Sequence, residues 1–198
     1  MTQVLRTFLA IELPDSTKNK IFDFIQPHRD LTKSLIRWVN WENLHITLKF
    51  LGEFDQTHVH QLNNLLTNCL NVIPVFKIHF DRIGAFPNLQ KPKVVWLGFD
   101  YPENLHLIYR HIEENILKLG YEGDDRPFSP HLTLGRVRRY LSKSEIINVG
   151  QIMSSVEFNF QSEFMVEKIT FFQSDLTREG PIYTKLFETN LVSNPSLC

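Results

Sequence analysis

The sequence predicts a fold that combines helices and strands in two similar lobes. The order strand, helix, strand, helix, strand occurs once from Val4 and again from Val94. In each series the middle strand carries a His-x-Thr-Leu tetrapeptide, at nearly the same distance from the first strand. Two copies of a unit this long can form one duplicated domain. We therefore expect a single domain over residues 1–198, with pseudo-repeats at about 4–90 and 93–190 and the two motif strands face to face.

The elements of the first series follow from the spacing of its apolar residues. Continuous or alternating apolar residues predict strands, and apolar residues three or four apart predict helices. Pro27 is expected to end or kink the first helix, because proline removes a hydrogen bond from a helix interior. The predicted order is a strand over 4–12, a helix from 14–16, an extended piece over 36–39, a strand over 44–51, a helix over 55–72, a strand over 75–83 and a loop over 84–92 that carries Phe86.

The second series is read in the same way. Gly120 is a plausible end for its first helix, since glycine is favoured just after a helix. A Gly180-Pro181 pair predicts a turn between the last two strands. The predicted order is a buried strand over 94–99, a helix over 102–119, a polar loop over 123–130, a strand over 131–137, a helix over 142–153 and strands over 156–172 and 182–187.

Composition limits the classes of protein that fit. A hydrophobic content of 42% and a charged content of 22% are typical of a soluble globular protein. The net charge of −1 gives no general attraction to nucleic acid or membrane, so a site for a polyanion has to be local. Cys69 and Cys198 provide neither a disulfide framework nor a zinc spacing, and this favours the cytoplasm. We expect no signal peptide and no membrane span. Nothing demands more than a monomer.

The two tetrapeptides, His45-Ile46-Thr47-Leu48 and His131-Leu132-Thr133-Leu134, each lie in an apolar run that reads as a buried strand. Alternate side chains of a strand share a face, so each histidine and its threonine lie on one face, roughly 6–7 Å apart along the strand. A single His-x-Thr is a weak motif and is more often a structural polar pair. Two of them at matched places in a repeat indicate a site where two imidazoles and two hydroxyls converge.

The motifs and their surroundings resemble a known family, the two-histidine phosphoesterases. More narrowly, they are similar to the RNA 2′,3′-cyclic phosphodiesterases, also called the 2′-5′ RNA ligase family. The fold that this resemblance implies is a bilobal α+β domain in which two antiparallel sheets flank a central cleft, with the helices outside. The resemblance covers about 6–187 and is carried by residues 6–11, 37–39, 43–53, 94–98, 128–137 and 174–176, with Gly180 and Tyr183.

The resemblance also implies a reaction and roles. The enzyme would hydrolyse RNA 2′,3′-cyclic phosphate ends to 2′-phosphomonoesters, with His45 as the general acid (proton donor) and His131 as the general base (proton acceptor). Run in reverse, the same groups could form a 2′-5′ RNA linkage. Histidine suits both roles because its ordinary pKa of about 6.5 keeps both forms available near neutral pH. From the residues alone the two roles are interchangeable. Thr47 and Thr133 can donate to the nonbridging phosphate oxygens.

Other candidates for substrate binding surround the motifs. Arg136 is a candidate for binding phosphate or RNA backbone, although its position five residues after His131 puts it on the opposite face unless a bulge redirects it. Phe8, Phe50 and Phe86 could stack on bases, yet core packing is the more common role in a chain with sixteen phenylalanines. The basic run of Arg136, Arg138, Arg139 and Lys143 fits an RNA-facing patch and a solvated edge equally well.

The mechanism calls for no metal and no cofactor, and no metal-ligand cluster is visible in the sequence. The partner expected is RNA with a 2′,3′-cyclic phosphate end or a related nucleotide. Two alternatives stay open. The first is an RNA- or nucleotide-binding protein on the same scaffold with weak or vestigial hydrolysis. The second is a phosphodiesterase for a small cyclic phosphate, such as an ADP-ribose cyclic phosphate, and the width of the pocket decides that.

Overall fold

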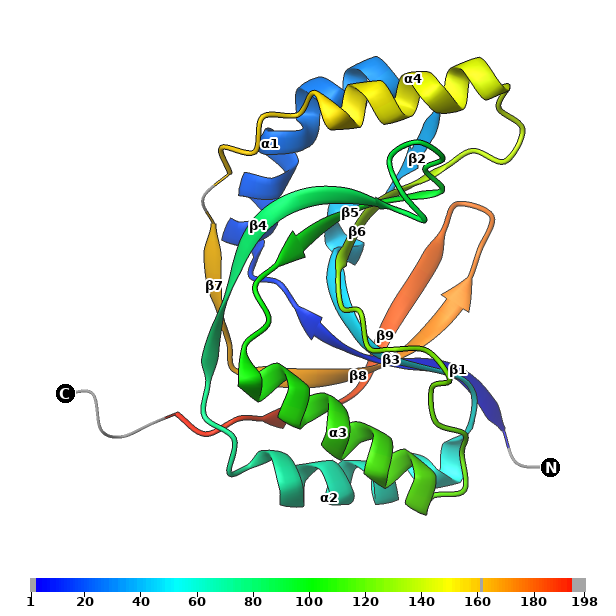
Figure 1. Ribbon diagram of the computed structural model, residues 1–198. Helices are drawn as coiled ribbons and strands as arrows, with labels where there is room; N and C mark the ends of the chain where they lie inside the picture. Colours follow the sequence, from blue (N-terminus) through cyan, green and yellow to red (C-terminus); the bar gives the residue numbers. More distant parts are fainter. Residues whose placement is uncertain (1–2, 161, 194–198) are drawn as a thin grey trace.

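A computed structural model describes residues 3–160 and 162–193 (Figure 1). Cys198 and both ends of the expected domain over 1–198 lie outside the described residues. The elements follow one another as β1 (Val4–Glu12), α1 (Asp15–Thr32), β2 (Ile36–Trp38), the short 3₁₀ helix η1 (Trp41–Asn43), β3 (His45–Asp55), η2 (Gln56–His58), α2 (Val59–Leu70), β4 (Phe76–Phe86), β5 (Val94–Phe99), α3 (Glu103–Lys118), β6 (Leu132–Val137), α4 (Lys143–Ser154), β7 (Glu163–Val166), β8 (Lys168–Leu176) and β9 (Pro181–Asn190).

The strands form an antiparallel sheet in the order β7-β4-β5-β6-β3-β1-β8-β9, with β2 paired to β6. The first motif strand, β3, and the second, β6, are neighbours at its centre, joined through the pairing of Ile46 with Leu132. The sheet curls on both sides of this junction, and α1 and α4 lie together at one end while α2 and α3 lie together at the other (Figure 1). The expected α+β class is confirmed, and the two expected sheets are the two halves of this path.

Each half of the sheet takes strands from both halves of the sequence. β4, from the first series, pairs with β5, and β8, from the second, pairs with β1. Read outward from the centre, β6-β5-β4-β7 on one side corresponds to β3-β1-β8-β9 on the other. This matching order supports the proposal that 4–90 and 93–190 are pseudo-repeats whose outer strands have been exchanged.

The structure corrects one part of the expectation for Pro27, because the helix does not end there. Helix α1 continues through it to Thr32. Tertiary contacts on both sides of Pro27 hold the helix in place: Ile25 is buried, and Thr32 is fully buried, accepting a hydrogen bond at 3.2 Å from the indole of Trp38. The stability that these contacts provide offsets the hydrogen bond lost at proline, which costs about 3 kcal/mol in an unsupported helix.

Two strand predictions also change. The expected strand over 156–172 is divided into β7 and β8, because β7 pairs with β4 at one edge of the sheet whereas β8 pairs with β1 near the other. β4 extends beyond the predicted 75–83 to Phe86, which pairs with Val94, so Phe86 belongs to a strand and not to the predicted loop. In both cases pairing with a distant strand decides the boundary.

A buried ion-pair cluster connects β3 to α3 and to the segment that precedes β6. Lys49 follows the first tetrapeptide directly, is 3% exposed, and points into the core. Its ammonium lies 2.8 Å from a carboxylate oxygen of Glu113 on α3 and 3.0 Å from one of Asp124, in the segment that leads to β6. The cluster therefore ties β3 to the segment that presents the second histidine.

Candidate active site

Matched β-bulges follow the two His-x-Thr pairs. Thr47 pairs with Ala10 and Lys49 with Leu9, so Leu48 is an extra residue in β3. Thr133 and Gly135 likewise pair with consecutive residues of β5, so Leu134 is an extra residue in β6. A bulge turns the residues after it by one position relative to the partner strand.

The bulges change which side chains accompany the motifs. Beyond each bulge, the fifth residue after the histidine returns to the face of the threonine. These residues are Phe50 on β3 and Arg136 on β6, and both line one cavity together with Thr47 and Thr133. The bulge thus turns Arg136 toward the face of Thr133, whereas simple alternation along the strand would put it on the opposite face.

The cavity has a volume of about 1200 Å³ and lies between the motif strands, the start of α1, the segment 37–45 and the β8–β9 hairpin. The sequence-predicted residues that line it are Phe8, His45, Thr47, Phe50, Thr133 and Arg136. His131 immediately precedes β6, two residues from Thr133. The cavity thus brings together predicted residues from both halves of the chain; His131 is not among its lining residues, although its charge affects the pKa of His45.

His45 is held firmly on both sides of its ring. Its Nδ1 lies 2.8 Å from the carbonyl oxygen of Asn43, and its Nε2 lies 3.1 Å from the hydroxyl of Thr47. The ring packs on Phe8 at 4.8 Å between centroids and meets Tyr183 edge-on at 5.3 Å. Because a carbonyl only accepts hydrogen bonds, Nδ1 carries the proton and the Thr47 hydroxyl donates to Nε2 of the neutral ring.

His131 repeats the backbone anchor of this arrangement on the other motif. Its Nδ1 lies 2.8 Å from the carbonyl oxygen of Ser129, again two residues earlier. Phe86 meets the ring at 80° and 4.8 Å between centroids, and Trp96 lies at 6.3 Å. In both histidines, therefore, a backbone carbonyl fixes the tautomer and leaves Nε2 to exchange a proton with a substrate.

Burial makes both histidines weaker bases than usual. It lowers the pKa of His45 to about 4; the Asn43 carbonyl works in the opposite direction, and the charge of Lys18 adds to the lowering. Burial also lowers the pKa of His131, where the hydrogen bond to Ser129 opposes it and the Arg136 charge reinforces it. Without a bound anion, both rings are neutral near pH 7.

The lowered pKa of His45 makes stability depend on pH. The unfolded chain binds a proton at this residue below about pH 6.5 and the folded protein only near pH 4. The free energy of unfolding is therefore expected to fall as the pH drops from 6.5 to 4, at about 1.4 kcal/mol per pKa unit of difference. Chemical denaturation across this range measures the slope. His45→Gln should flatten it, whereas His60→Gln, which removes an exposed imidazole of α2, should not; equal slopes in all three proteins would contradict the expectation.

The aromatic candidates behave differently from one another. Phe8 is only 3% exposed, and its ring is covered by His45 and by Phe172, stacked at 5.1 Å. It supports the His45 ring and leaves little surface for a base, which corrects the stacking role suggested for it. Phe50 is 46% exposed, with the guanidinium of Arg6 over its ring at 4.6 Å. Phe50 therefore keeps exposed ring surface although Arg6 covers part of it, and stacking of Phe50 on a base stays a prediction. Phe86 packs on His131.

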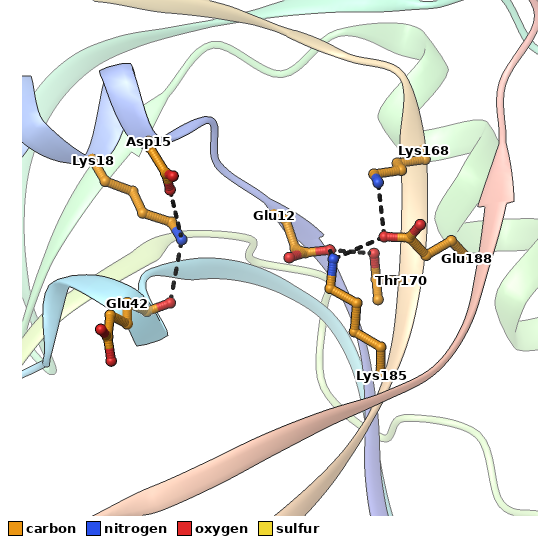
Figure 2. A network of polar contacts seen from close by, with 8 residues as sticks. All are labelled: Glu12, Asp15, Lys18, Glu42, Lys168, Thr170, Lys185 and Glu188. Carbon is orange, nitrogen blue, oxygen red and sulfur yellow. Dashed lines mark hydrogen bonds and ion pairs between the residues drawn. The ribbon is translucent and has the colours of Figure 1, made fainter.

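Sequence reasoning missed several residues of the cavity. Tyr183 was matched only as part of the resemblance, and its contact with His45 depends on the pairing of β9 with β8. Glu12 is the cross-strand partner of His45 and accepts hydrogen bonds at 2.8 Å from both Thr170 and Lys185 (Figure 2). Lys18 lines the cavity from α1. The sequence feature that could have indicated Glu12 and Lys18 is the presence of charged residues at the end of the first strand and the start of the first helix.

The described residues contain neither a candidate metal site nor a candidate membrane-spanning helix. Across residues 3–160 and 162–193, no group of three or more His, Cys, Asp or Glu side chains is placed to hold a metal ion. None of the helices in this part of the chain is both long enough and apolar enough to cross a membrane.

Comparison with known proteins agrees with the motifs. Residues 17–178 match the model of the 2′-5′ RNA ligase superfamily. The chain is 36% identical to the RNA 2′,3′-cyclic phosphodiesterase of Methanocaldococcus jannaschii, over 93% of this chain and 99% of that protein. It is 35% identical to the protein of that name from Archaeoglobus fulgidus, over 92% of this chain and 98% of that one.

Solved structures place the fold in the same group. The crystal structure of E. coli LigT complexed with 3′-AMP matches with a TM-score of 0.77 and 27% identity, over 96% of this chain and all of that one. Together with the paired His-x-Thr strands, these similarities show that the chain belongs to the 2′-5′ RNA ligase superfamily.

Proposed function

We propose that this protein hydrolyses the 2′,3′-cyclic phosphate at the end of an RNA to a 2′-phosphomonoester. The observation that carries the proposal is the pair of histidines with identical backbone anchors, each two residues before a threonine on one of the two strands at the centre of the sheet. Relatives named for this reaction, similar along nearly their whole length, support it.

In the proposed mechanism, Nε2 of His131 takes a proton from a water molecule, whose oxygen forms the new bond to phosphorus. The bond from phosphorus to the 3′ oxygen breaks, and Nε2 of His45 donates a proton to that oxygen. Thr47 and Thr133 donate to the nonbridging oxygens and stabilise their charge. If a 5′-hydroxyl takes the place of the attacking water, its oxygen forms the new bond to phosphorus, His131 takes its proton, the bond to the 3′ oxygen breaks with a proton from His45, and the product is a 2′-5′ linkage.

The charge beside His131 and a bound phosphate support this assignment of roles. Around His45 the fixed charges oppose each other, since Lys18 lowers its pKa and Glu12 raises it by less, and both effects are smaller than that of burial. A bound phosphate anion acts in the same direction as Glu12 and favours the protonated ring that an acid requires. Beside His131 the charge is that of Arg136, which favours the neutral ring that a base requires.

The size of the cavity bears on the alternatives. At about 1200 Å³ it exceeds the roughly 300–1,000 Å³ usual for small-molecule sites. This supports an RNA end over a small cyclic nucleotide. A binding protein with vestigial hydrolysis has no use for two anchored proton-transfer groups. Cytoplasmic location, a monomeric state and independence from metal remain predictions.

The deciding experiment uses a short RNA that ends in a 2′,3′-cyclic phosphate, incubated with the protein and a chelator. The expected product is a 2′-phosphate, identified by chromatography against both isomers. A 3′-phosphate would reverse the orientation of the substrate and the assignment of the acid. Activity that requires an added divalent ion would rule out the mechanism, and tight binding without turnover would favour the binding protein.

A further inference from the structure

Lys18 is a buried lysine in the wall of the catalytic cavity, and the mechanism above does not use it. It lies in the first turn of α1 and is 8% exposed. Its ammonium donates to the carbonyl oxygen of Glu42 at 3.2 Å and lies 3.7 Å from a carboxylate oxygen of Asp15, whose side chain is 78% exposed (Figure 2). A charge this well buried normally has closer partners.

The donors of this ammonium are only partly used. An ammonium has three N–H donors, and buried donors are nearly always hydrogen-bonded. Among the described residues, the Glu42 carbonyl is the hydrogen-bond partner of Lys18, and the contact with Asp15 is too long for a hydrogen bond. The other N–H donors of the ammonium are on the Lys18 side chain, which lines the cavity.

Two other lysines show what complete pairing looks like in this protein. Lys49, in the core, has two carboxylate oxygens within 3.0 Å. Lys185, on the same cavity, has Glu12 at 2.8 Å and Glu188 at 2.9 Å (Figure 2). Lys18 differs from both because no carboxylate in the described part of the chain lies at such a distance from its ammonium, whose further neighbour is the Trp41 ring, 5.7 Å from the ammonium to the ring centroid. An aromatic ring does not neutralise the charge, so the charge is available to an anion.

The position of Lys18 separates it from the reacting phosphate. The hydroxyl of Thr47 and Nε2 of His45 face each other on the reacting side of the ring, whereas Nδ1 faces the η1 turn through Asn43. Lys18 contacts that same turn, through the carbonyl of Glu42. An anion bound to Lys18 would therefore lie on the Nδ1 side of the His45 ring, whereas the reacting phosphate lies on the Nε2 side.

We propose that Lys18 binds a second phosphate of the substrate, the internucleotide phosphate on the 5′ side of the reacting nucleotide. This proposal rests on the proposed function. It makes Lys18 the residue that distinguishes an RNA end from a mononucleoside cyclic phosphate, because only the RNA end has a second phosphate.

The test measures binding and turnover with ligands that differ by one phosphate. Titration calorimetry compares adenosine 2′-monophosphate with adenosine 2′,5′-bisphosphate, and kinetics compare adenosine 2′,3′-cyclic phosphate with a diadenosine that ends in the cyclic phosphate. Lys18→Met is expected to weaken binding of the bisphosphate about 10- to 100-fold and to raise KM for the dinucleotide by a similar factor. The ligands with one phosphate should change less than about threefold.

Lys20→Met is the matched control, since Lys20 is an exposed lysine of the same helix and its loss changes the net charge equally. Lys18→Arg should retain most of the discrimination, and thermal unfolding verifies that each variant is folded, with Lys18→Gln as a second neutral variant. If Lys18→Met weakens both kinds of ligand equally, Lys18 acts through η1 and His45 and the proposal is wrong. If it weakens neither, the proposal is also wrong. If the wild type hydrolyses neither cyclic phosphate, the proposed function fails, while the calorimetry still decides whether Lys18 binds a second phosphate.

Discussion

Replacing either motif histidine by alanine is expected to lower kcat/KM for a cyclic phosphate end by at least about 10³-fold. A positioned proton transfer typically contributes about 10²–10⁴-fold, and this loss lies in the upper part of that range. Backbone carbonyls and aromatic contacts hold the His45 and His131 rings so that Nε2 of each is left for the substrate, and the alanine variants lose that proton-transfer group. Steady-state kinetics at several pH values measure the loss. The double variant should lose little more than the worse single variant, because both residues serve one step.

The control for this series is His79→Ala, which removes an exposed histidine of β4 and should leave kcat/KM unchanged. A His45 or His131 variant that keeps a tenth of the activity would contradict the mechanism. A nucleotide nitrophenyl diester separates the two roles, since nitrophenolate leaves without needing a proton. His45→Ala should be largely rescued with this substrate and His131→Ala should not; the opposite pattern would exchange the acid and the base.

Lys49→Met is expected to cause the largest loss of stability, about 3–5 kcal/mol of unfolding free energy. The substitution removes one member of a buried ion-pair cluster and leaves Glu113, whose side chain is 17% exposed, without its cation. Urea denaturation at pH 7 measures the effect.

Lys77→Met provides the comparison for an exposed pair. Lys77 lies 2.6 Å from Glu163, but the two side chains are 60% and 53% exposed. Surface ion pairs contribute about 0–1 kcal/mol, so this variant should unfold almost like the wild type. Similar losses for the two variants would show that burial of Lys49 is not what makes its pairing important.

The Lys49 cluster also bears on catalysis, because Asp124 lies in the segment that leads to Ser129 and His131. Loss of the cluster frees this segment from β3. A folded Lys49→Met protein should therefore show a lower kcat together with a weaker dependence of rate on His131, while the His45 side is little affected.

Local sequence determined much of this protein. Apolar periodicity placed most helices and strands, because each pattern is set by residues near one another in the chain. Alternation along a strand put His45 with Thr47 and His131 with Thr133, and the repeated order indicated that the two pairs would meet. The flanking motifs then supplied the family and its chemistry.

Pairing between distant strands decided the rest. Simple alternation pointed Arg136 away from the site, and the bulge at Leu134, which exists only in register with β5, turned it back. Whether an aromatic ring is free also depends on the whole fold: Phe8 is covered by Phe172 from β8, while Phe50 is exposed.

The same holds for charge. Lys18 and Lys49 are both lysines in the sequence, and nothing nearby in the chain tells them apart. The tertiary structure surrounds Lys49 with two carboxylates, from α3 and the following segment. It buries Lys18 near His45, where, within the described part of the chain, the ammonium has a backbone carbonyl as hydrogen-bond partner and the Trp41 ring as a more distant neighbour. Periodicity depends on neighbours along the chain, whereas register, burial and the pairing of charges depend on partners brought together by the fold, and these partners distinguish a structural lysine from one that is free to bind an anion.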